Sequence, residues 1–281
     1  MKVLVTGCAG WLGRNLIPAL EAAGHEVRGV DVVGTERPGD VVRDLCEEGV
    51  LTDVMEGVEV VVHTAAIHPW KPYTDTQYLD NNIKPTYHVL KTAVAKGVRR
   101  VVYTSSIAAV GYGWAVEELP LVEWAPARPD DLYGATKWFG EVFCESFSRR
   151  HDLETVCLRP PGFMPRPPLE LGRLLLGAFS HVIDVVAAHV AAVAAPMPTR
   201  HEAFWCTNAL PYTPADAPAL RTDPASVVER YWPGVPAWFE ARGQRVGPVP
   251  VLYDLSRARE ILGWTPQYTF DAWWEEYAHE L

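Results

Sequence analysis

A glycine-rich turn near residue 7 constrains the fold of this chain most strongly. The turn, Thr6-Gly7-Cys8-Ala9-Gly10-Trp11-Leu12-Gly13, has the spacing G-x-x-G-x-x-G and joins an expected strand to an expected helix. Gly7 permits a tight turn, Gly10 lets the backbone approach a pyrophosphate, and Gly13 lets the helix pack closely on the strand. The helix N-terminus offers free N–H groups to a phosphate. This order predicts a dinucleotide site, and a glycine-rich turn without a ligand is the alternative.

An acidic residue at the end of the next expected strand indicates which dinucleotide binds. Asp31 follows the strand expected over Glu26–Val30. A carboxylate there accepts hydrogen bonds from the ribose hydroxyls of NAD and repels the 2′-phosphate of NADP. Arg28 and Arg37 lie close by in sequence and leave NADP open as the alternative. We therefore expect NAD as the cofactor.

Apolar strand-like runs and amphipathic helix-like runs alternate over the first 160 residues. Strands are expected over Lys2–Thr6, Glu26–Val30, Val58–His63, Arg99–Thr104 and Glu154–Leu158. Helices are expected over Leu12–Ala23, Glu47–Met55, Gln77–Lys96, Tyr133–Arg150, Val182–Ala195, Ser226–Trp232, Ser256–Leu262 and Phe270–His279. The alternation predicts an α/β fold, a doubly wound parallel sheet of Rossmann type with helices on both faces.

Five prolines between residues 160 and 168 mark a change in the chain, because proline interrupts both helices and sheet pairing. We therefore expect an NAD-binding Rossmann domain over 1–160. A small C-terminal substrate-binding lobe is expected over 161–281, with some of its segments returning to the Rossmann domain.

A tyrosine and a lysine four residues apart at the start of an expected helix are the candidate catalytic pair. Tyr133 and Lys137 share one face of that helix, since residues at i and i+4 are neighbours. A phenol needs help to act as a base, and a nearby ammonium favours the phenolate. The lysine can also hold the nicotinamide ribose.

Two serines end the strand expected over Arg99–Thr104. Ligands of an open parallel sheet bind beyond the carboxyl ends of its strands, so a hydroxyl there can donate to a reacting oxygen. We assign that role to Ser106 and place Ser105 nearer the cofactor. A strand-end cap is the alternative, mainly for Ser105.

Charge and cysteine usage exclude several classes of protein. The net charge of -10 argues against nucleic acid as a partner. The five cysteines form no C-x-x-C pair, which argues against a disulfide framework and a zinc site, and we expect no metal. The longest apolar run, near 182–195, contains Asp184 and His189 and is too short to span a membrane. With no leader-like stretch, we expect a cytoplasmic protein without a membrane partner.

Together these residues resemble the extended short-chain dehydrogenase/reductase family, in its epimerase/dehydratase branch. Further matching segments are Asp44-Leu45, His63-Thr64-Ala65-Ala66, Asn82-Ile83-Lys84-Pro85-Thr86, Leu158-Arg159-Pro160, Asp254-Leu255-Ser256-Arg257-Ala258 and Leu262-Gly263-Trp264-Thr265-Pro266. The resemblance covers residues 1–160 and the C-terminal end. Pro85 departs from the family pattern, which has glycine at that position.

The resemblance implies that Ser106, Tyr133 and Lys137 form a catalytic triad and that relatives pair as homodimers through the helices near 77–96 and 133–150. The predicted cofactor-binding residues are Gly7, Gly10, Trp11, Leu12, Gly13, Asp31, Asp44, Leu45, Ala65, Ala66, Asn82, Ser105, Tyr133, Lys137 and Pro160. For His63 a buried polar residue is the alternative, and for Asn82 a link between two loops.

A short segment after Pro160 bears on the substrate. Only about twenty residues separate Arg159-Pro160 from Phe179-Ser180-His181, where nucleotide-sugar epimerases have a longer lobe. The layout resembles the uronate dehydrogenases, in which an arginine at the place of Arg173 binds the substrate carboxylate. Ile107-Ala108 replace the polar Asn-His of that subfamily. Ser106, Ile107 and Arg173 are therefore the candidate substrate contacts, with a surface helix position as the alternative for Arg173.

Several aromatic residues are expected near the strand carboxyl ends, where they can stack on a sugar ring or simply pack; these are Trp11, His68, Trp70, Trp114 and Trp138. We expect NAD-dependent hydride transfer to or from a small, sugar-like alcohol or carbonyl compound. A nucleotide-sugar epimerase or dehydratase is the second hypothesis. A non-catalytic Rossmann protein that senses NAD is the third.

Overall fold

The computed structural model describes residues 1–111 and 119–277, and its strands form one seven-stranded sheet. The strands are β1 (Lys2–Thr6), β2 (Glu26–Asp31), β3 (Val41–Val42), β4 (Val60–His63), β5 (Arg100–Thr104), β6 (Glu154–Arg159) and β7 (His201–Trp205). Their order is β3-β2-β1-β4-β5-β6-β7, and every pair is parallel. The strand order reverses at β1, which is where ligands of such sheets bind. The predicted Rossmann sheet is confirmed.

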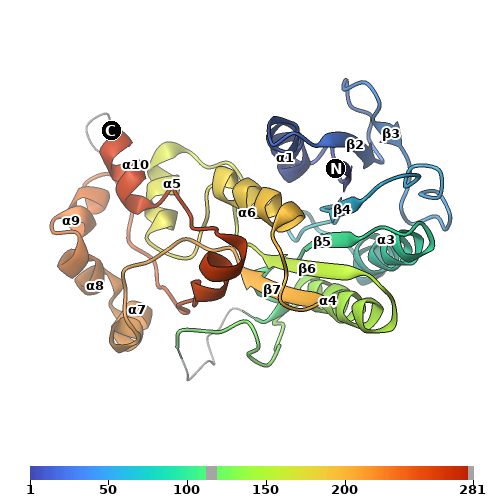
Figure 1. The fold of residues 1–281 in the computed structure, drawn as a ribbon. Helices are drawn as coiled ribbons and strands as arrows, with labels where there is room; N and C mark the ends of the chain where they lie inside the picture. The colour runs from blue at the N-terminus through green and yellow to red at the C-terminus, as the bar shows by residue number, and fades with distance from the viewer. Residues whose placement is uncertain (112–118, 278–281) are drawn as a thin grey trace.

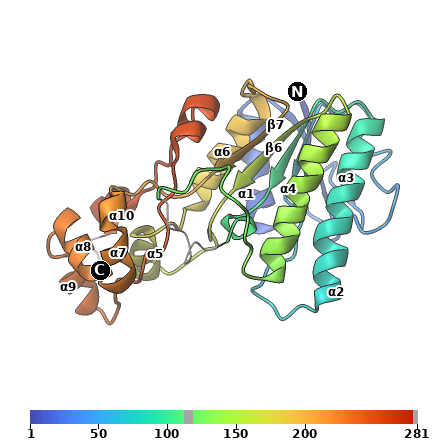
Figure 2. The same cartoon turned by 90° about the horizontal axis from the view of Figure 1, so that it is seen from below.

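Helices cover both faces of this sheet. On one face lie α1 (Trp11–Ala22) and α6 (Val182–Ala194). On the other, α3 (Lys84–Ala95) and α4 (Leu132–Arg150) lie side by side (Figure 2). Strand side chains alternate between the two layers, so Val60 and Val62 pack with Leu16 of α1, whereas Val61 packs with Val89 of α3. This two-sided burial explains the uninterrupted apolar run in β4.

Five further helices gather in a separate lobe (Figure 1). They are α5 (Pro168–Leu175), α7 (Ala217–Thr222), α8 (Pro224–Tyr231), α9 (Val235–Glu240) and α10 (Phe270–Tyr277). Their shared core is rich in aromatic rings, with Phe239, Phe270 and Trp273 buried together. Two segments beyond residue 160, α6 and β7, instead join the sheet.

Several local expectations differ from the structure. The helix expected over 47–55 is wrong, because the chain there forms turns and Gly49 takes a φ of 82°, which interrupts a helix. The helix expected over 77–96 is divided into α2 (Asp75–Tyr78), a π-helical turn over Leu79–Ile83, and α3. A π-helical turn over Ala258–Leu262 replaces the expected short helix, and a 3-10 turn over Pro214–Asp216 precedes α7.

β3 and β7 were not expected from the sequence. The last two residues of the helix expected over 270–279 lie outside the described residues, as does Trp114. Within the described part of the chain, no helix combines the length and apolar character needed to cross a membrane.

Candidate active site

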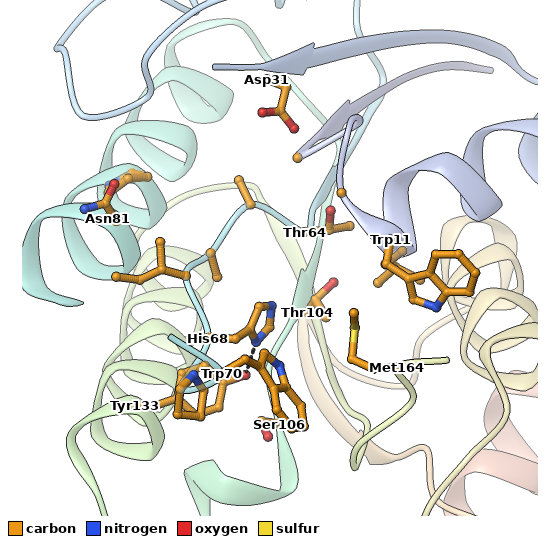
Figure 3. Close-up of a pocket in the computed structure, with 18 of the residues that line it drawn as sticks. Trp11, Asp31, Thr64, His68, Trp70, Asn81, Thr104, Ser106, Tyr133 and Met164 are labelled. Carbon is orange, nitrogen blue, oxygen red and sulfur yellow. Dashed lines mark hydrogen bonds between the residues drawn. The ribbon is translucent and has the colours of Figure 1, made fainter. Parts of the chain in front are cut away.

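A cavity of about 810 Å³ lies at the carboxyl ends of the strands (Figure 3). This volume is within the range of small-molecule and cofactor sites. Its lining comes from residues 7, 9–12, 31–33, 44–46, 64–71, 81, 85, 104–107, 133 and 160–164. Segments at the carboxyl ends of six strands, β1 to β6, therefore meet at one opening, on the side of the sheet where ligands of such folds bind.

The glycine-rich turn forms a cradle that has no room for side chains. Gly7 has a φ of 72°, and a Cβ added there would lie 2.8 Å from the Ala65 backbone nitrogen. A Cβ on Gly13 would lie 2.3 Å from the Gly7 carbonyl oxygen. Gly10 is the N-cap of α1, so the first N–H groups of that helix are at the turn. This arrangement fits the pyrophosphate of a dinucleotide.

Asp31 lines the cavity with a carboxylate held by the backbone. Its two oxygens accept hydrogen bonds from the N–H groups of Ala9 at 3.0 Å and Val33 at 3.1 Å. The nearby arginines have other partners. Arg28 donates to the Val54 carbonyl, and Arg37 pairs with Glu21 and Asp40. Neither arginine lines the cavity, so the carboxylate is positioned for ribose hydroxyls rather than a 2′-phosphate.

Asp31→Asn is therefore expected to shift cofactor preference toward NADP. Removing the negative charge removes its repulsion of the 2′-phosphate, and we expect the ratio of kcat/KM for NADP over NAD to rise about tenfold, equivalent to ~1.4 kcal/mol. Steady-state kinetics with both cofactors measure this ratio. The exposed Asp53→Asn is the matched control. An unchanged ratio in Asp31→Asn would show that the carboxylate takes no part in the selection.

Tyr133 and Lys137 lie in the first two turns of α4, whose N-cap Asp131 accepts a hydrogen bond from the Gly134 N–H. The hydroxyl of Tyr133 lies 3.0 Å from Nδ1 of His68. Lys137 is buried, and its Nζ donates to the Thr104 carbonyl at 2.8 Å and lies 5.9 Å from the centre of the Tyr133 ring. Burial lowers the pKa of Lys137 to about 7.

The two serines after β5 have different environments. Ser106 lines the cavity, and its hydroxyl accepts a hydrogen bond from the Ala108 N–H, capping the 3-10 turn over Ile107–Ala109. Ser105 also lines the cavity, but its hydroxyl donates to the Glu141 carboxylate. The capping alternative therefore describes one contact of Ser106, while Ser105 is tied to the buried layer beneath the site.

Glu141 and Arg159 form a buried ion pair under the cavity floor. The Arg159 guanidinium donates to both Glu141 oxygens, at 2.8 and 2.6 Å, and both side chains are almost completely buried. Arg159 also donates to the Glu123 carbonyl at 2.7 Å and lies 4.8 Å from the Trp205 ring centre. The side chain of this arginine thus turns away from the cavity, and Pro160 contributes to the lining instead.

His63 and Asn82 take part in buried hydrogen-bond networks. His63 contacts the hydroxyls of Thr6 at 2.7 Å and Thr86 at 3.0 Å, which agrees with the alternative of a buried polar residue. The Asn82 amide bonds to both backbone groups of Ile67 and to the Thr136 hydroxyl. Asn82 thus links the loop after β4 to α4, and its neighbour Asn81 lines the cavity.

Two buried histidines make stability sensitive to acid. Burial lowers the pKa of His63 to about 3 and that of His189 to about 4, from 6.5. The unfolded chain therefore binds more protons below 6.5, and stability falls as pH drops toward the folded-state values. We expect a slope approaching about 1.4 kcal/mol per pH unit for each histidine. Urea unfolding across this range measures the slope, and His189→Gln should reduce it. A free energy of unfolding independent of pH would contradict the expectation.

The remaining predicted residues divide into two groups. Gly7, Gly10, Trp11, Leu12, Asp44, Leu45, Ala65, Ala66 and Ile107 line the cavity, as do His68 and Trp70. Gly13, Asn82, Lys137, Trp138 and Arg173 do not line it. Arg173 lies near the end of α5, and its Nε is buried without a hydrogen-bond partner, so its contact with substrate stays a prediction.

Sequence reasoning missed the bond between His68 and Tyr133, and it did not assign Thr104, Phe163 or Met164 to the lining. Their positions at the carboxyl ends of strands could have placed them in the lining. His68 follows β4, Thr104 ends β5, and Phe163 and Met164 follow β6; the carboxyl ends of these strands meet at one edge of the sheet.

Comparisons with known proteins identify the family of this chain. A sequence model of the NAD dependent epimerase/dehydratase family matches residues 3–164. Uronate dehydrogenase from Pseudomonas syringae pv. tomato is 30% identical over 172 residues, which is 59% of this chain and 61% of that protein. L-Arabinose 1-dehydrogenase (NAD(P)(+)) from Haloferax volcanii is 33% identical over 177 residues, 56% of this chain and 65% of that protein. The matches span less than two thirds of these relatives.

A solved structure shares the fold over nearly its whole length. It is a short-chain dehydrogenase/reductase superfamily protein from Agrobacterium tumefaciens with bound NAD. Its TM-score is 0.78 at 24% identity, with 99% of this chain and 96% of that chain covered. The chain belongs to the NAD-dependent epimerase/dehydratase family, in the extended branch of the short-chain dehydrogenases/reductases, and NAD is the cofactor of this family.

Proposed function

We propose that this protein is a dehydrogenase that transfers hydride between NAD and a small alcohol or carbonyl compound, namely a free sugar or sugar acid. The observation that carries the proposal is the meeting of Tyr133 and Ser106 in the cavity that the glycine turn and Asp31 also line. Bound NAD supplies the hydride acceptor or donor. The chain must then position the alcohol and move one proton.

Each of these tasks has a residue in the proposal. The Tyr133 hydroxyl exchanges the proton with the substrate oxygen, and the Ser106 hydroxyl donates a hydrogen bond to that same oxygen. The Lys137 ammonium favours the deprotonated phenol and holds the nicotinamide ribose. The glycine turn holds the pyrophosphate, Asp31 the adenosine ribose, and Asp44 and Leu45 the adenine. Pro160 flanks the nicotinamide.

The short connection after β6 supports a small substrate. One two-turn helix, α5, separates the cavity segment 160–164 from α6, which returns to the sheet. We propose that the lobe over 161–281 closes the substrate side of the site, with Ile107 as an apolar contact and Arg173 as a carboxylate partner. A uronate-like substrate suits that arginine, because a guanidinium binds a carboxylate through two parallel hydrogen bonds.

An epimerase is the second candidate. UDP-glucose 4-epimerase from Mycolicibacterium smegmatis is 29% identical over 308 residues and matches 95% of this chain. An epimerase returns the hydride to its substrate and therefore releases no net NADH.

A substrate screen separates the two candidates. The enzyme is mixed with NAD or NADP and with free aldoses, uronic acids and simple alcohols, and NADH formation is followed by absorbance. Sustained NADH production with a free sugar or sugar acid is the expected result. Interconversion of a nucleotide sugar without any net NADH would instead identify an epimerase.

The outer face of α3 and α4 supports a homodimer. Exposed apolar side chains on this layer are Leu79 in the π-helical turn before α3, Tyr87 on α3, and Phe139 and Val142 on α4, each 39–49% exposed. Helix pairs of this kind commonly bury such side chains against a second copy. Light scattering should give twice the chain mass, and Phe139→Glu should give the monomer mass. Ile183→Glu, on the opposite face of the sheet, is the control, and a monomeric wild-type protein at micromolar concentration would contradict the proposal.

A cytoplasmic location suits the five free cysteines.

A further inference from the structure

A hydrogen bond joins the loop after β4 to the first turn of α4 inside the cavity. Nδ1 of His68 lies 3.0 Å from the hydroxyl oxygen of Tyr133, and the two ring centres are 5.4 Å apart. Figure 3 shows this bond as a dashed line between His68 and Tyr133, among the residues that line the cavity. The imidazole therefore contacts the atom that the proposed function uses for proton transfer.

The backbone beside His68 is held to the helix that carries Tyr133. The Ile67 N–H donates to Oδ1 of Asn82 at 2.8 Å, and Nδ2 of Asn82 donates to the Ile67 carbonyl at 3.1 Å. The same Nδ2 lies 3.0 Å from the Thr136 hydroxyl on α4. Both backbone groups of the residue before His68 are thus fixed relative to α4. These bonds hold the imidazole at a defined position relative to Tyr133.

The protonation state of His68 suits a partner of a tyrosine. Burial and the nearby Lys137 lower the pKa of His68 to about 4, so the imidazole is neutral at neutral pH. A neutral imidazole carries one donor and one acceptor nitrogen, and which is which depends on the tautomer. It can therefore accept a hydrogen bond from a phenol or donate one to a phenolate. Lys137, whose ammonium bonds to Thr104, acts on the Tyr133 ring from 5.9 Å.

We infer that His68 is a positioning residue for Tyr133. The imidazole fixes the Tyr133 hydroxyl in the cavity and stabilises the deprotonated phenol through Nδ1–H. The inference rests on the proposed function, because that function makes Tyr133 the proton-transfer group. The titratable groups near the pair include Lys137 on α4 and Asp131 just before it, Tyr78 at the end of α2, and Lys71 and Tyr73 on the segment between His68 and α2.

Ionisation of Tyr133 tests the inference without any substrate. Ultraviolet titration of the whole protein follows tyrosinate formation, and subtracting the curve of Tyr133→Phe isolates the signal of this one phenol. His68→Phe keeps a ring but removes both nitrogens, and we expect it to raise the pKa of Tyr133 by about one unit. His68→Asn places an amide near the position of Nδ1 and should restore most of the shift. His151→Asn, at the end of α4 outside the cavity, is the matched control.

Kinetics then separate positioning from direct substrate binding. With a substrate found in the screen, His68→Phe should lower kcat for alcohol oxidation about 10–100-fold and leave KM for NAD unchanged. Because the phenolate is the base in this direction, the acidic limb of the pH profile should move to higher pH. Equal Tyr133 titration curves in wild type and His68→Phe, with both proteins folded by thermal unfolding, would overturn the inference. A rise in KM for the alcohol with an unmoved pH profile would also overturn it. If the screen finds no dehydrogenase activity, the proposed function fails, and the titration still decides whether His68 stabilises the phenolate.

Discussion

Tyr133→Phe is expected to lower kcat about 10²–10⁴-fold, because it removes the hydroxyl that exchanges a proton with the substrate in the proposed function. The hydroxyl lies in the cavity 3.0 Å from His68, whereas the ring packs with Tyr78 and Ala108 and stays in the variant. Affinity for NAD, measured by calorimetry, should therefore change little. Single-turnover kinetics with a substrate from the screen measure the loss in the chemical step.

Tyr78→Phe is the matched control for this experiment. Tyr78 belongs to the same buried cluster but does not line the cavity, so its hydroxyl should be dispensable for turnover. If Tyr133→Phe retained full activity, the phenol could not be the proton-transfer group. If neither the wild type nor Tyr133→Phe showed turnover and both kept the same biological effect, the protein would be a non-catalytic NAD sensor, the third hypothesis from the sequence.

Glu141→Gln is expected to destabilise the fold by about 3–5 kcal/mol, because it leaves the Arg159 guanidinium buried without a counter-charge. Both side chains are under 5% exposed, and Arg159 is further held by the Glu123 carbonyl and the Trp205 ring. Arg159→Met should cost a similar amount through the stranded carboxylate. Urea unfolding at neutral pH measures both losses.

The double variant distinguishes the ion pair from simple packing. When Glu141→Gln and Arg159→Met are combined, no buried charge is left, so the loss of stability should be well below the sum of the single losses. Glu145→Gln removes one partner of an exposed pair on the same helix and should change stability very little. Additive losses in the double variant would show that the two charges do not depend on each other.

Because Ser105 donates to Glu141, Glu141→Gln should also weaken NAD binding if Ser105 lies beside the cofactor.

Local patterns in the sequence carried most of the fold and the outline of the site. Gly7, Gly10 and Gly13 belong to one short turn, whose backbone demands depend on neighbours a few residues away. The i, i+4 spacing of Tyr133 and Lys137 depends only on helical geometry. Apolar strands buried on both faces and separated by amphipathic helices leave few arrangements other than a doubly wound sheet, and the seven parallel strands agree.

Long-range packing decided the rest. No local pattern could show that His68 reaches Tyr133, which is 65 residues further along the chain, or that Arg159 turns toward Glu141. The same is true of Asn82, whose amide joins a loop to α4, and of α6 and β7, which return from beyond residue 160 to the sheet. The sequence by itself determined the type of sheet, the conformation of the glycine turn and the shared helix face of Tyr133 and Lys137, because these depend on chain-local geometry. Only the tertiary structure determined the partners of each polar side chain, because burial requires every charge and hydrogen-bonding group to find whichever partner the packing brings within reach.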